Sequence, residues 1–115
     1  MATVLLVEDE AALRHLLKRA LLLSGFDVCE AAGGHEALAL MEQVAPDVVV
    51  TDLVMPGMSG IALARAMAAL SSLADVPVII MSGTPNATIP IDYPVLEKPF
   101  PLRLLVDTVQ DLLRP

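Results

Sequence analysis

The chain alternates short, almost wholly apolar runs with longer segments of helical periodicity, and this alternation limits the folds it can adopt. The runs at 3–7, 48–51 and 76–81 each contain at most one polar residue. Such runs are typical of strands buried on both faces, which occur in parallel sheets covered by helices. Aromatic residues make up only 3% of the chain, so aliphatic side chains must fill the core. The pattern predicts an α/β fold with a doubly wound parallel sheet.

Five strands are expected, at residues 3–7, 26–31, 47–51, 76–81 and 93–97. Apolar side chains recur at helical spacing between these runs, from Glu10 onward, within 37–44, from 60 to about 70, and after Pro101. Gly25 and Pro46 are expected to end the first two helices. Right-handed crossovers place such helices on both faces of the sheet. Ligands then bind outside the carboxyl ends of the strands, where the chain reverses direction.

Composition excludes several classes of function. A chain of 115 residues is expected to form one domain, spanning residues 1–115. Its formal net charge of −7 argues against nucleic-acid binding and against docking on an anionic membrane. No apolar stretch approaches the roughly 20 residues that span a bilayer, and the start MATVLLVEDE turns acidic at once, unlike a signal peptide. The single cysteine, Cys29, cannot form an internal disulfide, so a cytoplasmic protein is expected.

Polar residues stand at the expected carboxyl ends of four strands. They are Glu8 and Asp9 after the first strand, Asp52 after the third, Ser82 after the fourth and Lys98 after the fifth. If the first and third strands are neighbours, three carboxylates converge, and their repulsion favours a bound cation. Oxygen ligands without a His or Cys group favour Mg²⁺. A metal, an ammonium, a hydroxyl and one further carboxylate suit phosphoryl transfer, with Asp52 as the nucleophile.

Each of these residues also has a simpler interpretation when taken alone. Glu8 and Asp9 could stabilise the start of the first helix, and Asp52 could cap a turn. Ser82 could begin an ordinary loop, and Lys98 could be a solvated surface charge. These explanations do not account for all of the residues falling at one edge of the same sheet, and this coincidence favours a site.

The motifs LLVEDE, VVVTDLVMPGMSG, VIIMSG and VLEKPF resemble, in order and content, those of receiver domains of two-component response regulators. The likeness covers nearly the whole chain. It implies a flavodoxin-like sheet of five parallel strands in the order 2-1-3-4-5. It also implies that Asp52 accepts a phosphoryl group. Mg²⁺ would be bound by Glu8, Asp9, Asp52 and the backbone carbonyl of Val54.

The resemblance further implies that Ser82 and Lys98 contact the phosphoryl group and that the Lys98–Pro99 peptide bond is cis. A histidine kinase or a histidine phosphotransfer protein would be the donor, docking near the first helix and the loop around Phe100. The domain would signal by protein–protein interaction, would assist its own phosphorylation and dephosphorylation, and would not be a conventional enzyme. Its oligomeric state stays open between a monomer and a weak dimer.

Two positions depart from the family pattern. Val95 stands three residues before Lys98, where many receivers carry the aromatic residue of their switch. The segment 83–93 contains Pro85 and Pro90 and is hardly longer than the roughly 10–12 residues that a crossover needs. Because proline interrupts helical hydrogen bonding, the fourth of the family's five helices is expected to be absent or reduced to about one turn.

The sequence also has to be compared with the requirements of several alternative functions. The chain could be a single-domain regulator or the receiver module of a hybrid histidine kinase. A Mg²⁺-dependent phosphohydrolase of the haloacid-dehalogenase kind would need a second aspartate where Val54 stands. A flavin or nucleotide binder would need a glycine-rich loop after the first strand, where Glu8 and Asp9 stand instead. A receiver-like scaffold without turnover would not need the full set of polar residues.

Overall fold

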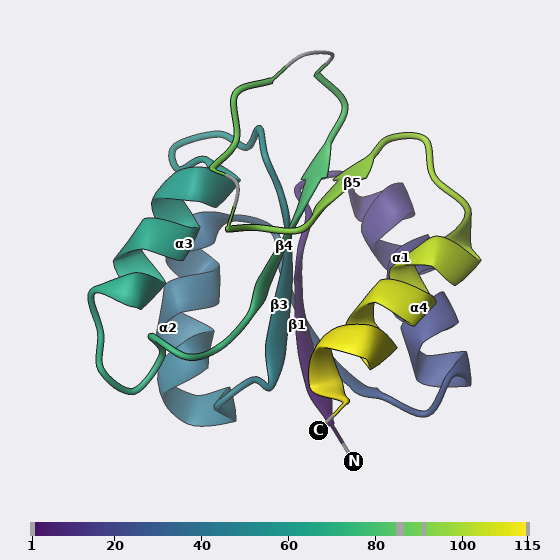
Figure 1. Cartoon of the computed structure of the whole chain (residues 1–115), viewed down its shortest axis with the longest axis horizontal. Helices are drawn as coiled ribbons and strands as arrows, with labels where there is room; N and C mark the ends of the chain where they lie inside the picture. The colour runs from purple at the N-terminus through teal and green to yellow at the C-terminus, as the bar shows by residue number, and fades with distance from the viewer. Residues whose placement is uncertain (1, 85–86, 91, 115) are drawn as a thin grey trace.

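The structure is a computed structural model and describes residues 2–84, 87–90 and 92–114. A central sheet is flanked by helices on both sides (Figure 1). Its strands are β1 (Thr3–Val7), β2 (Asp27–Ala31), β3 (Val48–Asp52), β4 (Val78–Ser82) and β5 (Val95–Glu97). All neighbouring strands are parallel, in the order β2-β1-β3-β4-β5. The expected flavodoxin-like α/β sheet is confirmed.

Four helices cover this sheet in the described parts of the chain. They are α1 (Ala11–Leu23), α2 (Gly34–Val44), α3 (Gly60–Ala68) and α4 (Leu102–Leu113). Helices α1 and α4 lie on one face, and α2 and α3 lie on the other (Figure 1). Gly25 follows α1 with a φ of 94°, the left-handed conformation expected of a glycine after a helix. None of the helices in the described ranges has the length and apolar character that crossing a membrane requires.

The sheet divides the core into two clusters because successive strand residues face opposite sides. Toward α2 and α3 the strands contribute Leu5, Val7, Val49, Val78 and Ile80. Toward α1 and α4 they contribute Val4, Leu6, Val48, Val50, Ile79, Met81 and Leu96. Strands β1, β3 and β4 are therefore buried on both faces, as their apolar runs predicted.

The crossover from β4 to β5 contains no helix in its described residues, 83–84, 87–90 and 92–94. The expectation that this helix is missing or reduced is confirmed for those residues, whereas Pro85 lies outside them. Ala87, Ile89 and Tyr93 pack instead against the core cluster under α2 and α3. The helix of this structure named α4 is thus the C-terminal one.

Several predicted strands begin one or two residues too early. Phe26 lies outside β2 because its N–H donates to the carbonyl of Leu21 at the end of α1 (3.2 Å). Pro77 and Pro94 immediately precede β4 and β5, and proline has no N–H to donate to the ladder. At the other end, β3 and β4 extend one residue further than expected. Pro101 precedes α4 as its N-cap and does not lie in its first turn.

Candidate functional site

The parallel register brings the carboxyl ends of the strands to one edge of the sheet. Asp52 is the last residue of β3, the central strand between β1 and β4. Hydrogen bonds continue the ladders past the strand ends on both sides. The N–H of Glu8 donates to the carbonyl of Ala31 (3.1 Å), and the N–H of Lys98 donates to the carbonyl of Ser82 (2.7 Å). The backbone of these polar residues is therefore as fixed as the sheet itself.

Three carboxylates meet at this edge. Glu8, Asp9 and Asp52 each place one carboxylate oxygen within 4.8 Å of the other two. Glu8 is 1% exposed and Asp52 is 8% exposed, while Asp9 faces solvent. An all-oxygen set with an open side suits Mg²⁺, which takes one or two carboxylates and keeps several waters. The acidic cluster expected from the strand ends is thus present.

Lys98 places its ammonium inside this acidic cluster. Its Nζ lies 2.8 Å from Oε1 of Glu8 and 3.0 Å from Oδ1 of Asp52. Burial raises the pKa of Glu8, and the charge of Asp52 adds to the rise, although hydrogen bonds from Lys98 and the Glu10 amide oppose it. Burial by itself would lower the pKa of Lys98. Its bonds and charge interactions with the two carboxylates outweigh burial, so the pKa of Lys98 is raised and its charge is secure at neutral pH.

Three further residues predicted for the site are Ser82, Val54 and Pro99. The Ser82 hydroxyl is buried, accepts a hydrogen bond from the N–H of Thr84 and donates one to its carbonyl (3.2 Å each). Val54 follows Asp52 by two residues and exposes its side chain. The Lys98–Pro99 peptide bond is cis.

Sequence reasoning missed two residues that support the site. Arg14 lies in α1, and its Nη1 donates to the carbonyl of Glu8 (2.7 Å). Gly60 begins α3 directly against Asp52, where a Cβ atom would overlap the Asp52 carbonyl oxygen. The glycine eight residues after Asp52 was a usable signal for a close approach, whereas the contact of Arg14 depends on how α1 packs.

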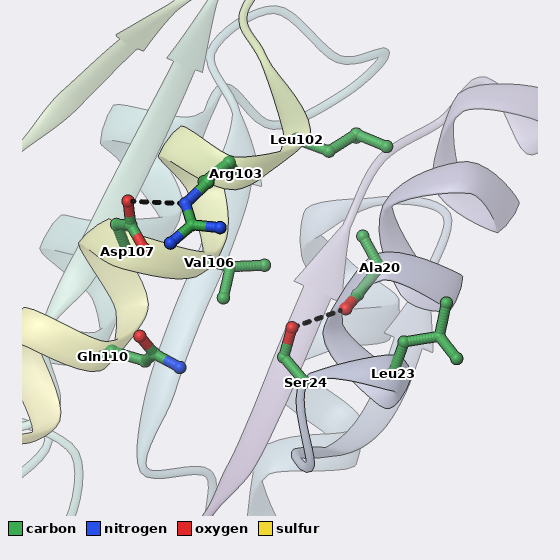
Figure 2. A pocket seen from close by; sticks show the side chains of 8 residues that line it. All are labelled: Ala20, Leu23, Ser24, Leu102, Arg103, Val106, Asp107 and Gln110. Atoms are coloured by element: carbon green, nitrogen blue, oxygen red, sulfur yellow. Dashed lines mark hydrogen bonds and ion pairs between the residues drawn. The ribbon is translucent and has the colours of Figure 1, made fainter.

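The pocket between α1 and α4 is separate from the acidic cluster. Figure 2 shows it lined by side chains of the last turn of α1 and the length of α4. Its lining residues are Ala20, Leu23, Ser24, Leu102, Arg103, Val106, Asp107 and Gln110. None of the acidic residues at the strand ends contributes to its volume of about 380 Å³, so this pocket has no part in the site.

A second pocket lies next to the site. It has a volume of about 530 Å³ and lies between α1 and the segment joining β5 to α4. Lys98 and Gly83 are among its lining residues, and Leu13, Leu16 and Phe100 contribute apolar surface. The acidic edge of the sheet therefore borders an apolar groove large enough to hold side chains of another protein.

Comparison with known proteins assigns this architecture to a family. The response regulator receiver domain model matches residues 4–110. The chain is 42% identical over 120 residues to sensor kinase CckA of Brucella abortus, covering 97% of this chain but 12% of that kinase. It is 33% identical over 119 residues to response regulator receiver protein CpdR of the same organism, covering 98% of each. The chemotaxis protein CheY4 of Vibrio cholerae superimposes with a TM-score of 0.88 at 30% identity, covering 98% of this chain and 99% of that one.

The chain therefore belongs to the response regulator receiver family. It is a phosphoacceptor domain of two-component signalling. The resemblance seen in the motifs is confirmed, which favours this assignment over a phosphohydrolase or a flavin binder. Because one relative is a sensor kinase and another a small receiver protein, a hybrid-kinase receiver and a single-domain regulator both stay open.

Proposed function

We propose that Asp52 receives the phosphoryl group of a two-component phosphorelay. The observation that carries this proposal is the setting of its carboxylate, which is nearly buried at the end of the central strand. The ammonium of Lys98 lies 3.0 Å from it, and the carboxylates of Glu8 and Asp9 lie beside it. A reactive acid needs such a polar, preorganised environment, in which charge developing on the transferred group is balanced by fixed partners.

The reaction proposed for Asp52 is an in-line displacement. A carboxylate oxygen attacks the phosphorus of a phosphohistidine, a P–O bond forms, the P–N bond breaks, and the imidazole leaves. Glu8, Asp9, Asp52 and the backbone carbonyl of Val54 would hold Mg²⁺, which when bound offsets the charge of the phosphoryl oxygens. In this way the domain would assist both the arrival of its phosphoryl group and its later hydrolysis.

Lys98 and Ser82 have distinct roles in this proposal. Lys98 stays protonated at neutral pH and pairs with the phosphoryl group in place of its present partners, Glu8 and Asp52. Ser82 must release the carbonyl of Thr84 before its hydroxyl can donate to a phosphoryl oxygen. Phosphorylation would thereby change the start of the segment that joins β4 to β5.

The groove beside the site is the proposed docking place for a histidine kinase or a histidine phosphotransfer protein. Leu16 and Phe100 line it together with Lys98, so a partner lying there would present its histidine next to Asp52. This partner, and a cytoplasmic setting in which the thiol of Cys29 stays reduced, are part of the proposal.

Phosphorylation by a small donor tests the role of Asp52. With acetyl phosphate and Mg²⁺, the wild-type chain should gain one phosphoryl group, and Asp52→Asn or removal of the metal by EDTA should abolish the gain. Intact-mass spectrometry measures it directly. Asp27→Asn, which changes an exposed aspartate at the start of β2, is the matched control and should be labelled like the wild type. Equal labelling of Asp52→Asn would exclude Asp52 as the acceptor.

A further inference from the structure

Arg14 joins three elements next to the acidic cluster. It lies in the first turns of α1, and its side chain is only 19% exposed. Its Nη1 donates to the carbonyl of Glu8 at the end of β1 (2.7 Å). Its Nε donates to Oε1 of Glu30 on β2 (3.1 Å). One guanidinium therefore connects the helix, the acidic turn and the neighbouring strand.

The turn from β1 into α1 is held by hydrogen bonds to Glu8, one of which comes from Arg14. The N-cap residue of α1, Glu10, makes no side-chain capping bond. The side chain of Glu8 accepts a bond from the Glu10 N–H (3.1 Å), and the Glu8 N–H donates to Ala31 (3.1 Å). The Glu8 carbonyl completes this set by accepting from Arg14. All three polar groups of Glu8 are thus bonded, and Asp9 is held between two fixed residues.

Glu30 determines the orientation of the Arg14 guanidinium. Its two carboxylate oxygens bind different cations, Arg14 at 3.1 Å and Lys18 at 2.5 Å. A guanidinium presents its donors in a rigid planar fork, so pairing one edge with Glu30 fixes the direction of the other. The other edge then points at the Glu8 carbonyl. It is kept from the carboxylates of the cluster, for which it would otherwise compete with a metal ion.

We propose that Arg14, held by Glu30, is a positioning residue that sets how Glu8 and Asp9 present their carboxylates to Mg²⁺. It touches neither the metal nor the phosphoryl group, and acts through the backbone carbonyl of Glu8. This inference rests on the proposed Mg²⁺ site. Outer-shell partners of this kind typically account for about 10- to 100-fold in metal affinity when they are replaced.

The alternative role for Arg14 is that of a nearby charge, and the two roles predict opposite signs. Removing a cation close to three carboxylates strengthens their attraction for Mg²⁺. Removing a positioning contact weakens binding, because the carboxylates must be ordered when the ion binds. The direction of the change in affinity therefore distinguishes the two roles.

Calorimetric titration of the metal-free full-length chain with Mg²⁺ alone provides the test. Arg14→Gln should bind Mg²⁺ about tenfold more weakly than the wild type. Arg14→Lys should also bind more weakly, because one ammonium cannot reproduce the fork between Glu8 and Glu30. Lys18→Gln is the matched control: it removes a cation from the same Glu30 but no contact with Glu8, and should bind at least as tightly as the wild type.

Urea unfolding in EDTA separates positioning from a general loss of stability. If Arg14→Gln does not fold, the Mg²⁺ affinity of Arg14→Lys decides whether the inference holds. A variant that loses stability but keeps wild-type Mg²⁺ affinity overturns the inference, and so does tighter binding by Arg14→Gln. A wild-type chain that binds no Mg²⁺ overturns the proposed metal site itself, an outcome distinct from the failure of Arg14 alone.

Discussion

The two faces of the sheet are covered by different kinds of structure. On one face, α1 and α4 form a continuous helical layer over residues of all five strands (Figure 1). On the other, α2 lies against β1 and β2 and α3 lies against β4, and among the described residues of the β4–β5 crossover Ala87, Ile89 and Tyr93 pack against the same core cluster. In β5, Leu96 faces the first side and is 4% exposed, whereas Val95 faces the second and is 39% exposed.

The difference between the two faces shows which elements of the receiver fold position the acidic cluster. Glu8, Asp52 and Lys98 take their positions from strand ends, and the ladders that fix them continue to β5. The described residues of the β4–β5 crossover add Ala87, Ile89 and Tyr93 to the core cluster on the second face, and β5 keeps its parallel register with β4. The described residues between β4 and β5 contain no helix, and the acidic cluster forms at the edge of the sheet nevertheless.

Truncation of neighbouring residues on β5 gives the largest expected contrast between the faces. Leu96→Ala should lower the free energy of unfolding by about 3 kcal/mol, because it leaves a cavity under α1 and α4. Val95→Ala should lower it by less than about 1 kcal/mol, because its side chain is already partly in water. Urea unfolding monitored by far-UV circular dichroism measures both. Similar losses for the two variants would mean that the crossover seals its face as well as the helices do.

Substitution of two glycines near the acidic cluster makes the comparison sharper. Gly60→Ala should destabilise the chain by about 2 kcal/mol, because its Cβ meets the Asp52 carbonyl and overpacking of this kind costs about 1–3 kcal/mol. Phosphorylation from acetyl phosphate should fall with it, since α3 cannot approach Asp52. Gly83→Ala, after β4, meets no atom closer than 3.9 Å and is the control, expected within about 0.5 kcal/mol of the wild type. If Gly60→Ala leaves both stability and phosphorylation unchanged, α3 can shift without disturbing the site.

The sequence predicted the fold and the residues at its acidic edge because both depend on local patterns. An apolar run shows where a strand ends, and the parallel order then brings Asp52 and Lys98 together. The two prolines of the crossover likewise predicted that its described residues contain no full helix. The roles proposed for these residues are still predictions.

What the sequence did not predict depends on packing between distant elements. The link from Arg14 to Glu8 requires the rotation of α1 against β1 and β2, which helical periodicity does not specify. The packing of the partly buried Ile89 depends on how the β4–β5 crossover lies across the sheet. Strand starts were misplaced where Pro77 and Pro94 withhold a hydrogen-bond donor.

The smallest expected effect belongs to the polar margin of the α1 and α4 face, where Glu30 pairs with Lys18 and Arg14. The hydrogen bond from Lys18 lowers the pKa of Glu30, and Arg14 adds to the shift. A carboxyl group whose pKa is lowered by folding stabilises the native state above its unfolded pKa of about 4.5, and loses this contribution as the pH falls through the folded value. Because more than a third of the side chain is exposed, the contribution should stay below about 1 kcal/mol.

Glu30→Gln measures this contribution by urea unfolding at two pH values. The variant should be less stable than the wild type at about pH 7, and the difference should shrink as the pH falls through the lowered folded pKa of Glu30. In a Lys18→Gln background the difference at neutral pH should shrink, since the strongest partner of Glu30 is gone. A difference that persists unchanged at low pH would assign the effect of Glu30 to packing against α1 and not to its charge.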